Sequence, residues 1–237
     1  MIPKIIHYCW FGGKPLPKLA QICIESWRKY LPEYEIREWN ESNFDINSHP
    51  FTAEAYTARK FAFVTDYVRL FVLRNEGGIY MDTDVEVLQP LDKFLHHPAF
   101  SGFEPGGQVP TGIMASEKNG EWVTWQLEQY ENKHFSENEE TNTMLITRVM
   151  SERGFKLNNK YQEFENIFVA YPSDFFCPLV SAGHKLHLTA NTHCIHHFAG
   201  SWLPHHVKIR TKLMRMLPEW LSDRLHATMR KIENRKK

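Results

Sequence analysis

The stretch GGIYMDTDVEVLQPLD, residues 77–92, carries two aspartates, Asp82 and Asp84, that stand two residues apart after a short apolar run. Carboxylates this close repel one another and raise each other's pKa. A hard divalent cation removes that cost because it binds oxygen ligands readily. A metal that also holds a phosphorylated ligand would explain both side chains. An exposed, charged turn at a strand end is the alternative, and the tripeptide alone leaves both explanations open.

The position of the pair at a strand end favours the metal site. In α/β sheets, ligands bind beyond the carboxyl ends of the strands, and Asp82 directly follows a predicted strand. Trp10 similarly closes an apolar, β-prone run over residues 4–10 and precedes a glycine pair, so its indole is expected at the sheet's carboxyl edge. A tryptophan packed into the core is the alternative for Trp10.

Asp66 and Arg69 form a second candidate pair. They lie three residues apart in a segment with strong helical periodicity, and therefore on one face of a predicted helix. A surface or capping ion pair would contribute little. The flanking residues are apolar, however, and a buried pair of charges in such surroundings calls for a purpose. These apolar neighbours are Phe63, Val64, Leu70 and Phe71.

The elements that must position these residues follow from the hydrophobic pattern. Strands are predicted over residues 4–10, 34–40, 100–105 and 111–116, and over two short stretches that flank the aspartate pair within residues 79–91. Helices are predicted over residues 16–32, 51–60, 62–78, 120–131 and 138–152. Residues 169–179 read as loop-rich, and residues 191–202 as a buried strand that runs into a turn.

This order begins with a strand, a helix and a strand, which implies a parallel sheet covered by helices. The fold class is therefore α/β. A single domain is expected over residues 1–204, followed by a basic helical tail over residues 205–237. In the helix over 62–78, the closing glycine pair is predicted to form the C-cap.

The charge of the chain is unevenly distributed. The 237 residues contain 28 basic and 28 acidic side chains, but the tail from His205 onward carries ten Lys or Arg against three Asp or Glu. Its apolar residues recur at near-helical spacing, so it could lie on an anionic membrane or pack on the domain with a solvated basic face. Nucleic acid is not expected as a partner, because no recognition motif accompanies the charge.

Four stretches in order resemble the glycosyltransferases of family 32, which have a sugar-binding region containing a DXD motif. They are IPKIIHYCWFGG, FVTDYVRL, GGIYMDTDVE and HHFAGSW. The resemblance runs from Ile2 to about Trp202. It extends more distantly to the catalytic domain of the large glucosylating toxins. It implies the GT-A fold, with a Rossmann-like nucleotide-binding half, and transfer of a sugar from a nucleotide donor.

The resemblance also implies roles for the donor-side residues. Trp10 should stack on the nucleotide base. Asp66 and Arg69 should hold donor-sugar hydroxyls and phosphate. Ser201 and Trp202 resemble a serine and a tryptophan that close over the diphosphate, although they are adjacent here and separated by one residue in the toxins.

For the metal, the resemblance implies Mn²⁺ or Mg²⁺ bound directly by Asp84. Asp82 would contact the ribose and reach the metal directly or through water. His197 begins a His-x-x-Gly turn and is the expected imidazole ligand, with His196 on the opposite face of the strand. The segment around Thr141 and Asn142 resembles a family Thr-Asn segment near the acceptor, and helix capping explains it equally well.

The prediction is a metal-dependent glycosyltransferase that moves a hexose or N-acetylhexosamine from a nucleotide-sugar donor, with UDP favoured over GDP. The resemblance implies that the reaction retains the anomeric configuration. The expected acceptor is a glycan or a lipid-linked oligosaccharide in polysaccharide biosynthesis. A metal-dependent phosphohydrolase and a non-catalytic glycan- or membrane-binding protein are the alternatives. The four cysteines show no paired spacing, which favours a cytoplasmic protein, with possible peripheral contact at the inner face of the cell membrane.

Overall fold

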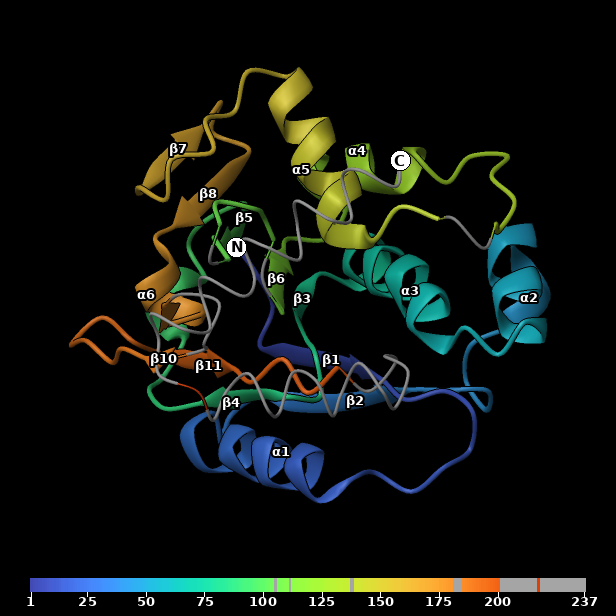
Figure 1. Ribbon diagram of the computed structural model, residues 1–237, viewed down its shortest axis with the longest axis horizontal. Helices are drawn as coiled ribbons and strands as arrows, with labels where there is room; N and C mark the ends of the chain where they lie inside the picture. The colour runs from blue at the N-terminus through green and yellow to red at the C-terminus, as the bar shows by residue number, and fades with distance from the viewer. Residues whose placement is uncertain (105, 111, 137–138, 181–184, 201–216, 218–237) are drawn as a thin grey trace.

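The computed structural model describes residues 1–104, 106–110, 112–136, 139–180, 185–200 and 217. Within them the chain forms a seven-stranded mixed sheet with helices on both faces (Figure 1). The predicted basic tail, apart from residue 217, lies outside the described residues together with Ser201 and Trp202. The α/β class predicted from the sequence is confirmed.

The first half of the sheet is parallel, as the strand–helix–strand pattern predicted. β1 pairs with both β2 and β3 in parallel. The strands and the helices that connect them are β1 (Ile5–Cys9), α1 (Lys18–Tyr30), β2 (Glu35–Trp39), η1 (Ile46–Ser48), α2 (Pro50–Thr57), α3 (Phe61–Glu76) and β3 (Gly78–Met81).

The glycine pair between α3 and β3 has the conformation that the sequence predicted. Gly77 is the C-cap of α3 with φ +72°, and its N–H donates to the Leu73 carbonyl. Gly78 has φ +111°, and a Cβ there would lie 2.7 Å from the Ile5 carbonyl oxygen. Both positions therefore need glycine, and together they turn the chain from the helix directly into β3.

The second half of the sheet corrects the parallel-sheet prediction. The strand order is β2-β1-β3-β6-β5-β8-β7, and β6 runs antiparallel to both β3 and β5. The connection from β5 to β6, residues 103–112, has no helix among its described residues and is too short for a parallel crossover. These strands are β5 (Ala99–Gly102), β6 (Ile113–Ser116), β7 (Gln162–Phe164) and β8 (Phe168–Tyr171).

The other helices and strands all follow β3 in the chain. Residues 169–179, predicted to be loop-rich, instead contain the end of β8, the short helix α6 and the start of β9, so that prediction was wrong. The elements are β4 (Val85–Val87), η2 (Asp92–Phe94), α4 (Glu121–Glu128), α5 (Asn142–Glu152), α6 (Ser173–Phe176), β9 (Leu179–Val180), β10 (Lys185–Leu186) and β11 (Cys194–His196).

Two hydrophobic cores lie on opposite faces of the sheet. The larger joins α3, α4 and α5 to the sheet, and the other joins α1 and α6 to it. Within the second core, the fully buried indole of Trp27 donates a hydrogen bond of 2.7 Å to the carbonyl of Val85. This bond fixes the start of β4, one residue after the aspartate pair.

β4 and β11 form a separate antiparallel ribbon. His196 pairs with Val85, and Cys194 pairs with Val87. The pairing brings a segment near the end of the described chain beside Asp84, although more than one hundred residues separate them. The ribbon therefore brings His196 next to the aspartate pair.

No helix among the described residues is long and apolar enough to cross a bilayer. The adjacent histidines His96 and His97 differ in their burial. His96 is exposed, whereas His97 is buried and lies 2.7 Å from the hydroxyl of Tyr171.

Candidate active site

The aspartate pair follows β3 in a tight turn. The N–H of Asp82 donates to the Gly112 carbonyl at 2.8 Å, and the N–H of Val85 donates to the Asp82 carbonyl at 3.0 Å. The first bond ties the turn to the start of β6, and the second closes it before β4. The backbone therefore holds both aspartates in place independently of their side chains.

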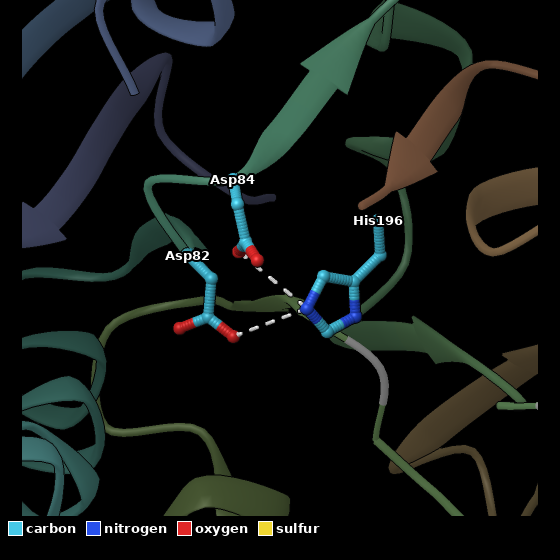
Figure 2. Close-up of side chains that lie close together, drawn as sticks. All are labelled: Asp82, Asp84 and His196. Carbon is cyan, nitrogen blue, oxygen red and sulfur yellow. Dashed lines mark ion pairs between the residues drawn. The ribbon is translucent and has the colours of Figure 1, made fainter. Parts of the chain in front are cut away.

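Each carboxylate has one oxygen bound by the protein and the other directed at His196 (Figure 2). Oδ2 of Asp84 accepts from the N–H of Ala199 at 2.7 Å, and Oδ1 of Asp82 accepts from the Tyr80 hydroxyl at 3.0 Å. The other oxygens lie 3.5 Å (Asp84) and 3.9 Å (Asp82) from Nε2 of His196. The three side chains thus converge on one point.

This group suits a divalent cation. Asp82, Asp84 and His196 each offer one ligand atom, and these atoms lie within 4.8 Å of one another. Two carboxylate oxygens and an imidazole nitrogen are donors that Mn²⁺ and Mg²⁺ accept, with the imidazole favouring Mn²⁺. Among the described residues it is the one such cluster of three.

The structure exchanges the two histidines relative to the sequence prediction. His196, assigned to the opposite face, points to the aspartates, whereas His197, the expected ligand, lies with Nε2 2.9 Å from Glu86. The two side chains point in different directions, as predicted, but the one that faces the aspartates is His196 and not His197. This orientation follows from the ribbon, in which His196 pairs with Val85 and the N–H of His197 donates to the Asp84 carbonyl.

The electrostatics of the cluster show strong mutual attraction. Burial alone would raise the pKa of Asp84, but the hydrogen bond and charge of His196 and the N–H of Ala199 lower it to about 2. Burial alone would lower the pKa of His196, and Asp84 and Asp82 nevertheless raise it well above its usual value. The site therefore favours a positive charge between the two carboxylates.

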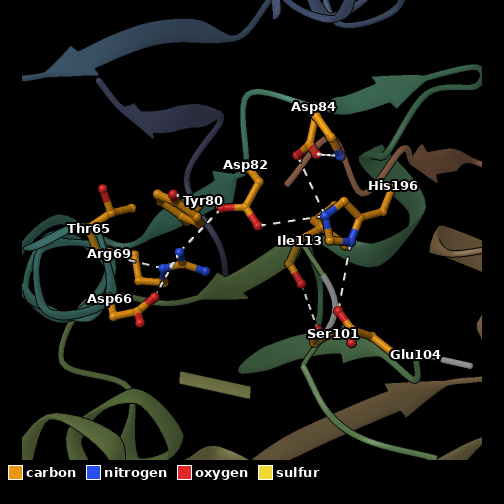
Figure 3. A network of polar contacts seen from close by, with 11 residues as sticks. Thr65, Asp66, Arg69, Tyr80, Asp82, Asp84, Ser101, Glu104, Ile113 and His196 are labelled. Carbon is orange, nitrogen blue, oxygen red and sulfur yellow. Dashed lines mark hydrogen bonds and ion pairs between the residues drawn. The ribbon is translucent and has the colours of Figure 1, made fainter. Parts of the chain in front are cut away.

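Asp66 and Arg69 belong to the same network (Figure 3). The guanidinium of Arg69 lies 3.0 Å from Asp66 and 3.3 Å from Asp82, and its centre is 4.6 Å from the centroid of the Tyr80 ring. The helical pair predicted from the sequence is thus buried and directly connected to the aspartate motif. Burial raises the pKa of Asp66 to about 6, although Arg69 acts in the opposite direction.

The start of α5 lies beside Asp66. The backbone of Asn142 hydrogen-bonds Asp66 and lowers its pKa. The hydroxyl of Thr141 accepts from the Met144 N–H at 3.4 Å, which confirms the capping explanation for this segment. The amide of Asn142 is buried and has no hydrogen-bond partner among the described residues.

Trp10 stands where the sequence predicted, directly after β1. Because β1 and β3 are parallel, Trp10 and Asp82 follow strands at the same edge of the sheet. The indole is half-buried, and its N–H donates to the Lys14 carbonyl. The structure does not bring Trp10 into contact with the carboxylate network, and Ser201 and Trp202 lie outside the described residues.

Three residues of the site were not singled out from the sequence. Tyr80 donates to Asp82, and Gly112 leaves room for the ring of His196, since a Cβ there would lie 3.1 Å from that ring. Oε1 of Glu104 lies 3.7 Å from Nδ1 of His196, and burial raises the pKa of this glutamate to about 7. Tyr80 alone had a sequence signal, as it stands two residues before the motif.

Comparison with known proteins agrees with this geometry. Inositol phosphoceramide mannosyltransferase 3 of Schizosaccharomyces pombe is 33% identical over 121 residues, which cover 49% of this chain and 34% of that protein. Mannosyltransferase 2 of the same series is 32% identical over 124 residues, with the same coverage. The aligned part thus spans about a third of the length of these relatives.

Among solved structures, the PaToxG glycosyltransferase superposes with a TM-score of 0.51 at 19% identity, covering 64% of this chain and 70% of that one. The likeness shows a common fold, which is α/β and GT-A-like. Residues 17–101 match the family described as glycosyltransferase sugar-binding region containing DXD motif. The resemblance inferred from the sequence is therefore confirmed over residues 17–101, the stretch that matches this family and that contains Asp82 and Asp84.

Proposed function

We propose that this chain is a metal-dependent glycosyltransferase that moves a sugar from a nucleotide-sugar donor to an acceptor hydroxyl. The observation that carries the proposal is the convergence of Asp82, Asp84 and His196 at the carboxyl edge of the sheet. The matched sugar-binding region and the GT-A-like fold support it.

Asp82, Asp84 and His196 would hold Mn²⁺ or Mg²⁺. A bound cation would act as a Lewis acid on the diphosphate that leaves the donor sugar. The chain itself orients the two carboxylates, since Asp84 accepts a hydrogen bond from the N–H of Ala199 and Asp82 accepts one from the hydroxyl of Tyr80. His196 replaces His197 in this proposal because only His196 faces both aspartates.

On the donor side, Arg69 lies 3.3 Å from Asp82 and would add a positive charge that favours binding of a diphosphate. Asp66 would accept hydrogen bonds from hydroxyls of the donor sugar, a role that the resemblance implies. Trp10 would stack on the base, an interaction worth about 1–3 kcal/mol and tolerant of base identity. Ser201 and Trp202 would close over the diphosphate.

Mannose is the first sugar to test, because the relatives described above are named mannosyltransferases. Both UDP and GDP remain to be tested as the nucleotide, with UDP as the expectation from the sequence. Retention of configuration, a glycan or lipid-linked acceptor, and peripheral contact of the basic tail with the cytoplasmic face of a membrane complete the proposal. The names of these relatives include inositol phosphoceramide, which is a lipid, and this supports a lipid-linked acceptor.

The deciding experiment is a calorimetric titration of the purified chain with UDP and with GDP, first with Mn²⁺ and then with a chelator. The proposal expects binding of one nucleotide that depends on the metal. Absence of binding of either nucleotide by folded protein would overturn it.

Product analysis then separates transfer from hydrolysis. A transferase requires an acceptor for full turnover of the donor, whereas a phosphohydrolase with the same three ligands would turn over at full rate without one. Equal rates with and without acceptor sugars or lipids would favour the hydrolase.

A further inference from the structure

Nδ1 of His196 is a buried polar atom without a hydrogen-bond partner among the described residues. Nε2 of the same ring faces Asp82 and Asp84. An imidazole that binds a metal through Nε2 carries its proton on Nδ1. A buried N–H without an acceptor is costly, so the second nitrogen of His196 needs a partner when the first one binds a cation.

Glu104 is placed to be that partner. Its Oε1 lies 3.7 Å from Nδ1 of His196, and only 14% of its side chain is exposed. Its backbone is held on both sides: its N–H donates to the Gln108 carbonyl at 2.8 Å, and its carbonyl accepts from Gly107 at 3.0 Å. A shift of about 0.8 Å would bring the carboxylate and the ring nitrogen within hydrogen-bond distance.

The ring of His196 lies close to Gly112 and to the ring of Phe198. A Cβ on Gly112 would lie 3.1 Å from the ring, so the absence of a side chain there lets the ring approach the backbone. The ring of Phe198 stacks on His196 at a centroid distance of 4.0 Å. With the plane held in this way, the groups at the two ring nitrogens decide which nitrogen faces the aspartates.

We infer that Glu104 is a positioning residue for the metal: it accepts a hydrogen bond from Nδ1–H of His196 and holds Nε2 toward Asp82 and Asp84. The inference rests on the proposed metal-dependent function. Carboxylates that hydrogen-bond a metal-bound histidine fix its tautomer and raise its basicity, and their loss weakens metal binding about 10–100-fold. The thiol of Cys177 also contributes to the raised pKa of His196, but a thiol is only a weak acceptor.

The neighbouring pair Glu86 and His197 provides a matched control. It is also a glutamate beside a histidine, at 2.9 Å, but both side chains are 30% exposed, and neither belongs to the group of Asp82, Asp84 and His196. Glu86→Leu therefore removes the same type of contact from the histidine next to His196. A role specific to Glu104 should be absent at Glu86.

The test measures Mn²⁺ affinity of the full chain by electron paramagnetic resonance of the free ion, a readout independent of turnover. Glu104→Leu is expected to weaken Mn²⁺ binding about 10–100-fold. Glu104→Gln, which keeps a neutral acceptor, should restore part of the affinity, and Glu86→Leu should leave it within about twofold of wild type. Circular dichroism of each variant verifies the fold.

A double-mutant comparison separates positioning from direct ligation. In a His196→Ala background, a further Glu104→Leu substitution should leave Mn²⁺ affinity unchanged, because Glu104 acts through the ring. A further loss would show that Glu104 binds the metal itself and would overturn the positioning role. Wild-type affinity in Glu104→Leu would overturn it as well, whereas a wild-type chain that binds no Mn²⁺ would overturn the proposed metal-dependent function.

Discussion

Arg69 and Arg148 each bridge two carboxylates, yet they do so in opposite surroundings. Arg69, on α3, contacts Asp66 and Asp82 at 3.0 and 3.3 Å, and only 11% of its side chain is exposed. Burial alone would lower its pKa, but electrostatic interaction with Asp82, Tyr80 and Asp66 raises it above its usual value. The cluster keeps its charges although it lies almost out of water.

Arg148, on α5, contacts Glu140 and Glu152 at 3.2 and 3.3 Å, with 45% of its side chain exposed. Exposed pairs of this kind are screened by solvent and contribute little to stability. A buried cluster must instead repay a large desolvation penalty, and an apolar replacement of similar volume is often at least as stable. The comparison teaches that the Arg69 cluster is better explained by function than by stability.

Among substitutions that test this contrast, Asp84→Ala is expected to have the largest effect, and the effect is on the transfer rate. Loss of a metal ligand removes several kcal/mol of transition-state stabilisation, so the transfer rate should fall by about 10³-fold or more. The comparable change at the exposed cluster, Glu140→Ala, should leave the rate unchanged. Rates are measured with saturating Mn²⁺ on protein of verified fold, and an active Asp84→Ala enzyme would contradict the assignment.

Arg69→Met should destabilise the protein by about 3–5 kcal/mol, because it leaves the buried carboxylate of Asp66 and the partly buried carboxylate of Asp82 without their counter-charge. Arg148→Met should change the free energy of unfolding by about 0.5 kcal/mol or less. Denaturant unfolding of both variants gives the two values directly. Equal losses would break the comparison and assign the two arginines the same structural role.

Gly112→Ala probes the packing next to the cluster. Its Cβ would lie 2.9 Å from Cγ2 of Val85 and 3.1 Å from the ring of His196. Overpacking of this kind costs about 1–3 kcal/mol, and the ring is expected to be pushed from its place, so Mn²⁺ affinity should fall as well. Denaturant unfolding and metal titration are measured together; unchanged values in both would show that the ring has room to move.

The smallest expected effect is on the pH dependence of stability, and it comes from His7, a buried histidine that stays neutral. Nδ1 of His7 accepts from the Trp39 indole at 3.0 Å, so Nε2 must carry the proton donated to the Gly77 carbonyl, 2.8 Å away. Burial lowers the pKa of His7. Its unfolded form therefore binds a proton that the folded form does not, and stability falls as the pH drops below about 6.5.

For His7 this slope is at most about 1.4 kcal/mol per pH unit, and it ends below the folded-state pKa. Unfolding curves of wild type and His7→Gln between pH 5 and 8 test it. The variant should lose part of the pH dependence, and identical slopes would show that other histidines carry it.

Much of the first half of the fold could be predicted from local pattern alone. Apolar runs of strand length, the periodicity of α3 and the glycine pair at Gly77 are local signals, and they placed Asp66, Arg69 and Asp82 correctly on their elements. The reversal of β6 could not be predicted in this way. It depends on which strand the chain returns to, and that choice is made by packing over many residues.

Local sequence pattern also could not predict which histidine belongs to the site. His196 and His197 are adjacent and chemically identical, so no local signal distinguishes them. Pairing of His196 with Val85 sets the phase of the strand, and that partner lies far away in the sequence. Glu104 was missed for a similar reason: it is a lone carboxylate after β5, and only the folded chain brings it to His196.

The β4–β11 ribbon also has a consequence for how the protein is made. Asp82 and Asp84 leave the ribosome more than one hundred residues before His196, because chains are synthesised from the N-terminus. Until β11 has been added, the nascent chain can form its parallel half but holds only two of the three ligands. Metal capture would then be a late event in biosynthesis, and pairing of the last ribbon strand would convert a folded intermediate into a binding-competent enzyme.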